Sequence, residues 1–179
     1  MHNQLVNMVK LCNKYKKIIE EIMIDSNGYR ENVGIILLNG ENQVFWGRRK
    51  GEDSWQFPQG GVYDNEAIEA AMLRELNEEL GLFPQHIKIL AQTKKWLYYD
   101  VPGLYNRNNK NFYRGQKQIW FLLRLIGQDH HINVKFHKEQ EFDAWRWVDY
   151  WFPINEVVNF KQEVYDKALH QLHSFINMV

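Results

Sequence analysis

The sequence predicts an α/β fold in which a mixed β-sheet is sandwiched between helices. Two observations carry this prediction: strand-like segments alternate with two main helical segments, and 45% of the 179 residues are hydrophobic. A chain of this length suits one domain of ordinary size, and that apolar share is enough for a sizeable core. No internal repeat or low-complexity segment interrupts the pattern.

The first half of the predicted domain holds two strands and one long helix. Residues 33–38 form a continuous apolar run, which is typical of a buried strand. The turn at residues 40–42 leads back into a second strand at residues 43–48. Residues 66–80 contain neither proline nor glycine and are rich in strong helix formers, so they predict a helix.

This helix has recognisable ends and an apolar side. Asp64 or Asn65 would cap its start by accepting a backbone N–H, and Gly81 suits the left-handed residue that ends a helix. One apolar stripe follows at helical spacing and predicts the face that packs on the sheet: Met72, Leu73, Leu76 and Leu80.

The second half of the chain supplies the other strands and a C-terminal helix. We expect strands at residues 87–99, 118–125 and 144–148. A polar loop at residues 101–115 separates the first two of these strands. After the last strand, a helical turn and an amphipathic helix are expected at residues 153–158 and 161–177.

The first residues stand apart from this domain. Residues 5–23 carry apolar side chains at helical spacing, which is typical of an amphipathic helix that packs on the domain or on a partner. The alternative, which we favour, is an upstream extension that is not native, because Met23 offers a plausible start. We therefore divide the chain into an extension at residues 1–22 and a domain at residues 23–179, and expect no chemistry in the extension.

Composition excludes several classes of protein. With 22 basic and 22 acidic residues the formal net charge is zero, so the chain lacks the basic coat of a general nucleic-acid binder, and we expect no DNA partner. The single cysteine, Cys12, excludes a disulfide within the chain and a cysteine-based zinc site. No stretch of about 18 apolar residues predicts a membrane span. We expect a cytoplasmic monomer.

An acidic cluster lies on the helix predicted at residues 66–80. Glu75, Glu78 and Glu79 are spaced i, i+3 and i+4, so their carboxylates share one face of the helix. Like charges at this spacing destabilise a helix by about a few tenths of a kcal/mol. A divalent cation removes that penalty, and carboxylate ligands suit Mg²⁺ or Mn²⁺. Such an isolated cluster is more often an acidic surface, so its flanking residues decide the interpretation.

The flanking residues complete a longer motif. Residues 60–82 follow the pattern G-x5-E-x7-R-E-L-x-E-E-x-G-L, which matches the Nudix box in full. The resemblance implies a Nudix-type α/β/α sandwich with a mixed β-sheet. It also implies an enzyme that hydrolyses a nucleoside diphosphate linked to another group with Mg²⁺ or Mn²⁺.

The resemblance also assigns roles to single residues. It implies that the three box glutamates hold the metals with the backbone carbonyl of Gly60, and that a further glutamate, Glu141, comes from a Glu-Phe-Asp segment. For Glu141 the alternative is a salt bridge at a strand edge. Catalysis would therefore rest on four glutamates, and whether Glu78 or Glu141 accepts the proton stays open. The motif residues Glu66, Arg74 and Gly81 are expected to be structural.

Segments outside the box indicate a narrower resemblance over residues 23–176. The chain resembles the bacterial RNA pyrophosphohydrolases, which remove pyrophosphate from the 5′-triphosphate end of RNA and so initiate mRNA decay. The Trp-Gln-Phe-Pro-Gln-Gly segment also occurs in the related dinucleoside polyphosphate hydrolases, which remain the alternative. A Nudix-fold module that binds nucleotides or RNA without cleaving them is a third interpretation, although the box glutamates are all present. The matching segments are Asn27-Gly-Tyr-Arg30, Trp55-Gln-Phe-Pro-Gln-Gly-Gly61, Gly115-Gln-Lys-Gln118, Glu141-Phe-Asp-Ala-Trp-Arg-Trp147 and Asn159-Phe-Lys161.

The substrate implied is 5′-triphosphorylated RNA or another nucleotide polyphosphate, which needs cations beyond the metals. The resemblance favours Arg30, Arg49 and Lys161 for this role. Ser54 would add a hydroxyl donor. Phe160 resembles the family's base-stacking residue, and its alternative role is a hydrophobic staple at the start of the last helix.

Overall fold

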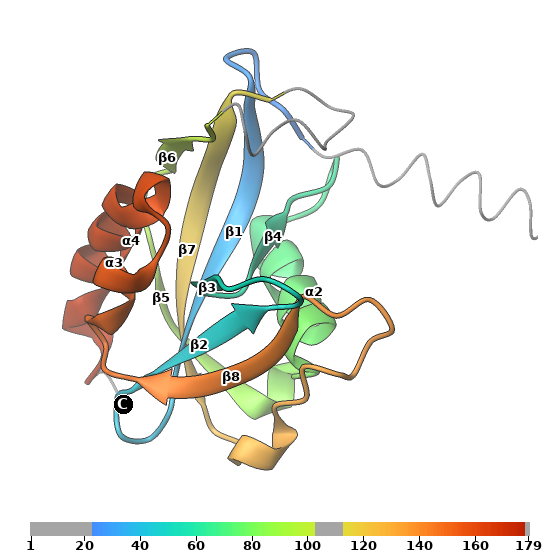
Figure 1. Ribbon diagram of the computed structural model, residues 1–179, viewed down its shortest axis with the longest axis vertical. Helices are drawn as coiled ribbons and strands as arrows, with labels where there is room; N and C mark the ends of the chain where they lie inside the picture. The colour runs from blue at the N-terminus through green and yellow to red at the C-terminus, as the bar shows by residue number, and fades with distance from the viewer. Residues whose placement is uncertain (1–22, 103–112, 178–179) are drawn as a thin grey trace, which may run out of the picture.

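The computed structural model of the chain describes residues 23–102 and 113–177 (Figure 1). The extension expected at residues 1–22 lies outside the described residues. Met23 already belongs to the sheet region, because its N–H donates to the carbonyl of Val62 at 3.2 Å and its carbonyl accepts from the N–H of Glu31 at 2.8 Å. In the described part of the chain, no helix has the length and apolar character needed to cross a membrane.

The centre of the fold is one sheet of eight strands. Strand β1 (Tyr29–Leu38) and strand β7 (Gly115–Leu125) run parallel at its centre, in register from Tyr29 opposite Gly115 to Leu38 opposite Arg124. All other pairings between named strands are antiparallel, so the predicted mixed sheet is confirmed. The remaining strands are β2 (Val44–Arg49), β3 (Trp55–Gln56), β4 (Gln59–Gly61), β5 (Ile87–Gln92), β6 (Leu97–Asp100) and β8 (Phe142–Val148).

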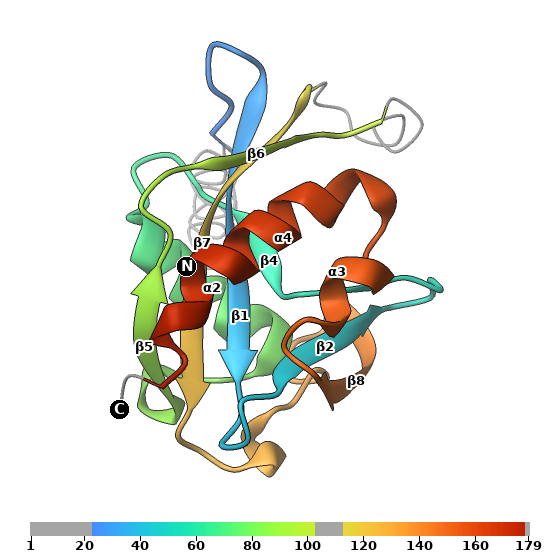
Figure 2. The ribbon, with the colours of Figure 1, turned by 90° about the vertical axis from the view of Figure 1, so that its left-hand side faces the viewer.

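Helices cover both faces of this sheet, which confirms the predicted sandwich (Figures 1 and 2). Helix α2 (Ile68–Leu80) covers one face, and α3 (Phe152–Glu156) and α4 (Asn159–Leu172) cover the other. Strand β1 alternates between the two cores: Ile35 packs on the α2 side and Ile36 on the α4 side. Short 3-10 turns lie at Pro84–His86, Asp129–His131 and His173–Phe175.

The start of α2 differs from the prediction, whereas its end agrees. The N-cap residue is Ala67, and no side chain caps it, so neither Asp64 nor Asn65 has the expected role. Asn65 instead takes a left-handed turn conformation with φ of 60°. Gly81 ends the helix with φ of 66°, as expected.

Several predicted segments also change their bounds. The long strand expected at residues 87–99 is divided into β5 and β6. Both pair with β7, but Gln92 lies opposite Phe121 and Leu97 opposite Gln118, so residues 93–96 face only residues 119–120 and the ladder is interrupted. Strand β1 begins four residues earlier than the apolar run, since its polar start pairs with β7. Most of the loop expected at residues 101–115 lies outside the described residues.

The segment that joins β3 to β4 ties the two sides of the molecule together. The N–H of Phe57 donates to the hydroxyl of Tyr165 on α4 at 3.1 Å, and the two rings stack with centroids 5.1 Å apart. The carbonyl of Pro58 accepts from the N–H of Ile35 on β1 at 2.9 Å. This anchoring holds the glutamines on either side of Phe57 and Pro58 in fixed positions above α2.

Candidate active site

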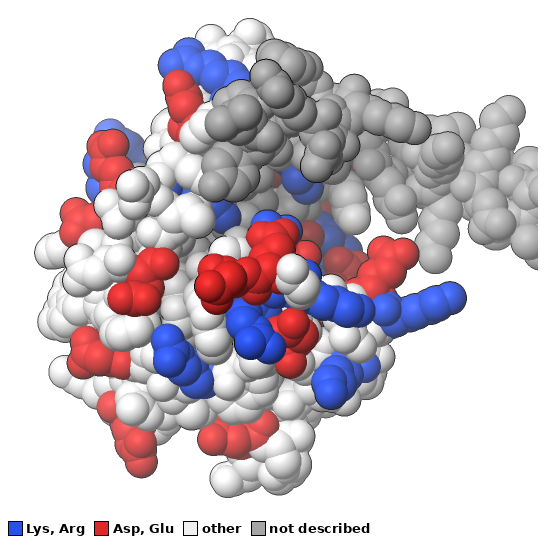
Figure 3. Space-filling model, viewed as in Figure 1, with Lys and Arg blue, Asp and Glu red and all other residues white. Residues whose placement is uncertain are grey.

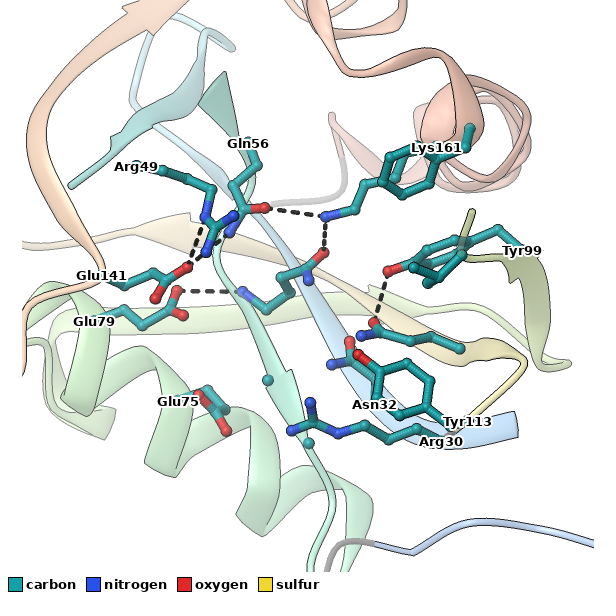
Figure 4. Close-up of a pocket in the computed structure, with 16 residues that line it drawn as sticks. Arg30, Asn32, Arg49, Gln56, Glu75, Glu79, Tyr99, Tyr113, Glu141 and Lys161 are labelled. Atoms are coloured by element: carbon teal, nitrogen blue, oxygen red, sulfur yellow. Dashed lines mark hydrogen bonds and ion pairs between the residues drawn. The ribbon is translucent and has the colours of Figure 1, made fainter. Parts of the chain in front are cut away.

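One cleft collects most of the residues singled out in the sequence. This main cleft has a volume of about 420 Å³ and lies between α2, the β3–β4 segment and the start of α4. Figure 4 shows the carboxylates of Glu75, Glu79 and Glu141 on one side, with Lys161 and Tyr99 opposite them. The acidic and basic walls come from segments far apart in the sequence, and the fold alone brings them together.

Arg74 organises the acidic wall. Its guanidinium donates to the carboxylate of Glu66 at 2.8 Å and to the carbonyl of Gly61 at 2.7 Å. These bonds tie the loop before α2 to the helix. A third branch of the same guanidinium lies 2.6 Å from Glu75 and 3.2 Å from Glu78. Arg74 therefore holds the loop and also sets the direction of two cluster carboxylates.

Glu75 and Glu79 are almost out of water, each with 8% of its surface exposed. Glu79 accepts one hydrogen bond from the backbone N–H of Gln59 at 3.2 Å. Burial, and next the negative charges of Glu75 and Glu141, raise the pKa of Glu79 well above its ordinary value. Burial raises the pKa of Glu75 as well, although Arg74 opposes this shift. The two carboxylates are thus packed together at an electrostatic cost.

The other two glutamates are more open. Glu141 accepts from Arg49 at 3.1 Å and from the side-chain amide of Gln56 at 3.3 Å. Glu78 has 47% of its side chain exposed. A second cavity of about 570 Å³, which we call the acidic hollow, adjoins the cluster on its outer side. It is lined by Tyr63, Glu75, Glu78, Glu79, His137, Lys138, Glu139, Gln140 and Glu141.

The donor set fits a divalent cation. Within the described ranges no three acidic or histidine side chains already gather into a complete ligand group. A Cβ built on Gly60 would lie 1.8 Å from the carboxylate carbon of Glu75, so glycine alone lets this carboxylate lie against β4. Buried oxygen donors with surplus negative charge are the ligands that Mg²⁺ or Mn²⁺ prefers.

Lys161 is the principal cation on the opposite wall. Its buried ammonium donates to the side-chain oxygens of Gln56 at 3.0 Å and Gln59 at 3.2 Å, and it makes no salt bridge with a described residue. Burial, with the positive charge of Arg49 next, lowers the pKa of Lys161 to about 8. A buried cation bonded only to amides is suited to attract an anionic group from the cleft.

Arg30 adds a second cation at the far end of the main cleft. Its guanidinium packs against the backbone of Gly61, since a Cβ there would come 2.4 Å from it. The buried Nε atom of Arg30 has no hydrogen-bond partner among the described residues. A buried N–H without a partner is costly, and a phosphate oxygen in the cleft would supply that partner.

Ser54 is the one predicted substrate residue that does not line the main cleft. It belongs to a neighbouring cavity of about 280 Å³, the side hollow, which is also lined by Trp55, Phe160 and Lys161. Its hydroxyl donates to Glu52 at 2.9 Å. Arg49, Gln56, Phe160 and Lys161 line both the main cleft and the side hollow, so the two cavities share a boundary.

A set of amides in the main cleft was missed from the sequence. Gln56 and Gln59 orient Lys161, Glu141 and Glu79, and the buried Gln118 donates to Asn32 at 2.6 Å. The available signal was the Trp-Gln-Phe-Pro-Gln segment, in which two glutamines flank residues that are buried. Acidic and basic side chains lie side by side over the face formed by β2, β3 and β8 (Figure 3), without a field of one sign.

Comparison with known proteins agrees with this architecture. The NUDIX domain family model matches residues 28–172. An Escherichia coli dihydroneopterin triphosphate pyrophosphohydrolase superposes with a TM-score of 0.61 at 15% identity, over 79% of this chain and 95% of that one. A Caenorhabditis elegans Ap4A hydrolase gives 0.60 at 17% identity, over 81% and 98%. A protein from Listeria monocytogenes that is named as a NUDIX hydrolase superposes with a TM-score of 0.57 at 24% identity, over 80% of this chain and 91% of that one. At these identities the likeness establishes the fold.

Replacement of Glu79 by glutamine should stabilise the protein when no metal is bound. A carboxyl whose folded pKa is raised is favoured protonated, so its contribution to stability is lost as the pH rises through that value. Above it, wild-type protein carries the cost and Glu79→Gln does not. At mildly alkaline pH with a chelator, we expect a higher melting midpoint for Glu79→Gln than for wild type.

Added Mg²⁺ should then raise the midpoint of wild type much more than that of Glu79→Gln, since binding to the folded state stabilises it. Glu69→Gln on the exposed first turn of α2 is the matched control and should respond like wild type. An equal Mg²⁺ response in all three proteins would contradict a ligand role for Glu79.

The affinity of the main cleft for polyphosphate should fall as the pH rises through about 8, because Lys161 then loses its proton. Lys161→Gln should bind a non-hydrolysable nucleoside triphosphate about ten- to a hundredfold more weakly at neutral pH. Dissociation constants measured with a chelator from about pH 7 to about pH 10 test this. If the dissociation constant of Lys161→Gln changed with pH as much as that of wild type, the pH dependence would belong to another group.

Stability should change in the opposite direction, which separates weaker binding from unfolding. Between about 8 and the ordinary value of 10.5, the unfolded chain keeps the Lys161 proton that the folded protein has released. Because the unfolded state then binds more protons, this group makes the free energy of unfolding rise with pH across the window. Lys161→Gln should lack that rise.

Proposed function

We propose that this protein, which belongs to the NUDIX domain family and hydrolyses phosphoric anhydride bonds, acts on the 5′-triphosphate end of RNA. In this proposal the enzyme removes pyrophosphate and leaves a 5′-monophosphate. Such a step in the cytoplasm would initiate the decay of a messenger RNA.

One observation carries the proposal: the main cleft and the side hollow share a wall formed by Arg49, Phe160 and Lys161. The main cleft offers carboxylates for cations and three basic side chains for phosphate oxygens. The side hollow offers an aromatic ring and the hydroxyl of Ser54, which suit a nucleobase. A triphosphate followed at once by a further nucleotide fits this pair of cavities.

The charge balance of the main cleft supports a polyphosphate. Lys161 donates only to amide oxygens, and the Nε atom of Arg30 has no partner among the described residues. Arg49 is held by Glu141 and by Glu52 at 3.0 Å, so it is oriented but not buried. Divalent cations would neutralise the acidic wall, and the three basic side chains would then face the remaining phosphate charge.

In the proposed mechanism, Glu75, Glu78, Glu79 and Glu141 would hold Mg²⁺ or Mn²⁺ with the carbonyl of Gly60. Such a cation supplies charge neutralisation at the phosphates and activation of the attacking water. Arg74 fixes the directions of Glu75 and Glu78, and Lys161 binds phosphate oxygens on the opposite side. Glu78 and Glu141 are the more exposed of the four carboxylates and line the acidic hollow, which supports either one as the acceptor of the proton of water.

Hydrolysis of dinucleoside polyphosphates is the second candidate. Tyr99 and Tyr113 line the main cleft and offer aromatic surface to a second nucleoside. RNA is favoured because the side hollow is lined by exposed residues on its outer side, so a bound chain can continue into solvent there. The carboxylates of Glu52 and Asp53 at this opening repel RNA phosphates, and Arg49 offsets part of that charge by pairing with Glu52. A module without catalysis is disfavoured by the presence of all four glutamates.

The decisive assay compares initial rates with Mg²⁺ on short triphosphorylated RNA and on diadenosine tetraphosphate. We expect kcat/KM to be at least about tenfold higher on RNA, which is about 1.4 kcal/mol of transition-state stabilisation. Glu79→Gln prepared in parallel should be inactive on both, which excludes a contaminating hydrolase. A preference for diadenosine tetraphosphate would replace the first proposal by the second.

Replacement of Phe160 by alanine should reduce kcat/KM on triphosphorylated RNA by roughly ten- to a hundredfold, because one stacked base contributes about 1–3 kcal/mol. Activity on a nucleoside triphosphate should fall much less, since that substrate has no following base. Both rates are measured together with the melting midpoint of the variant.

The alternative role of Phe160 predicts a different result. Its ring packs on the α4 side of the core and lies 6.0 Å from the ring of Tyr99, so it also helps to seat the helix. A staple alone would lower the melting midpoint and reduce both activities equally. That outcome would remove Phe160 from the binding site and weaken the RNA assignment.

A further inference from the structure

We propose that Arg146, which packs against the rings of Trp55 and Phe152, binds the RNA chain beyond its second nucleotide. This inference rests on the proposed function and extends it to a surface outside the main cleft. The guanidinium of Arg146 lies 4.5 Å from the ring centroid of Trp55 and 5.3 Å from that of Phe152. A planar cation therefore packs against two aromatic rings.

The position of Arg146 follows from the alternation of strand β8. Trp145 and Trp147 pack on the α2 side of the sheet, where the ring of Phe45 contacts both of them. Successive side chains of a strand point to opposite faces, so Arg146 emerges on the α3 and α4 side. This is the side on which Phe160 and the side hollow lie.

Arg146 continues directly from the side hollow. Trp55 lines that hollow, together with Phe160 and Lys161, and the same indole ring contacts Arg146. A chain that leaves the side hollow past Trp55 therefore meets the Arg146 guanidinium next. The sequence of surfaces is the main cleft for the triphosphate, the side hollow for the second base, and Arg146 for the phosphate or base that follows.

The positive charge of Arg146 is not neutralised by a salt bridge with any described residue. Arg48, Arg49, Arg74 and Arg114 each form a salt bridge with an acidic side chain. Arg146 is exposed and forms none with the described residues. Its contacts to Trp55 and Phe152 reduce the conformational entropy that an exposed arginine loses on binding. A preorganised guanidinium that forms no salt bridge with a described residue suits a phosphodiester.

The test varies RNA length. We would measure kcat, KM and the salt dependence of kcat/KM for a triphosphorylated dinucleotide and for a longer triphosphorylated RNA. Arg146→Gln should raise KM on the longer RNA by roughly three- to tenfold, reduce the slope of log kcat/KM against log salt by about one, and leave the dinucleotide unchanged. Arg146→Lys keeps the charge and should retain the salt slope.

Controls separate this inference from a structural role and from the function itself. Lys88→Gln changes an exposed cation on β5, at the opposite edge of the sheet, and should affect neither RNA. Equal losses on both RNAs with a lower melting midpoint would show that Arg146 only secures α3. Unchanged kinetics on both would refute the inference while leaving RNA hydrolysis intact.

If wild type hydrolyses neither RNA, a binding measurement tests the inference instead. The dissociation constant of the longer RNA is then measured by fluorescence anisotropy with a chelator. Weaker binding by Arg146→Gln would support the surface although the proposed function had failed. Equal binding by wild type and Arg146→Gln would refute both.

Discussion

The carboxylates of Glu75 and Glu79 are held side by side, nearly out of water, and much of the surrounding structure is arranged to tolerate that cost. Burial raises the pKa of both carboxyls, and the negative charge of Glu75 adds to the rise at Glu79. Arg74 offsets part of the charge and ties the helix to the loop before it. Gly60 permits the approach, because a side chain there would occupy the space of the Glu75 carboxylate. The buried carboxylates therefore carry an electrostatic cost that a bound divalent cation would offset.

The sheet makes this arrangement rigid. The parallel pairing of β1 with β7 sets the floor of the main cleft, and the β3–β4 segment crosses above it. The aromatic ring of Phe57, stacked on Tyr165, joins that segment to α4. The same connection carries Gln56 and Gln59 to Lys161, so the basic wall keeps its position relative to the acidic wall. A site built on buried strands and helices in this way is held more precisely than one built on loops.

The spacing of residues along the chain was sufficient to predict features that depend on one segment alone. Helical spacing identified the acidic face of α2, and a glycine at the end of an apolar stripe identified its left-handed terminus. The prediction failed where a distant partner decides. The strand at residues 87–99 is divided because its two halves pair with β7 in different registers. The predicted caps of α2 are absent because the loop before it is held by Arg74 and Glu66. Which cavity Ser54 lines is likewise decided by the tertiary structure, and its role as a hydroxyl donor stays a prediction.

The sequence by itself determined the fold class, the family motif and the helix that carries three of the four cluster glutamates, because hydrophobic period and short-range spacing are local quantities. Only the tertiary structure decided how deeply Glu79 is buried and which amides orient Lys161. It also decided that Arg146 packs against both Trp55 and Phe152. Burial, charge and cavity shape depend on contacts between residues that are distant along the chain. Those contacts exist only after the sheet has brought its two layers of helices together.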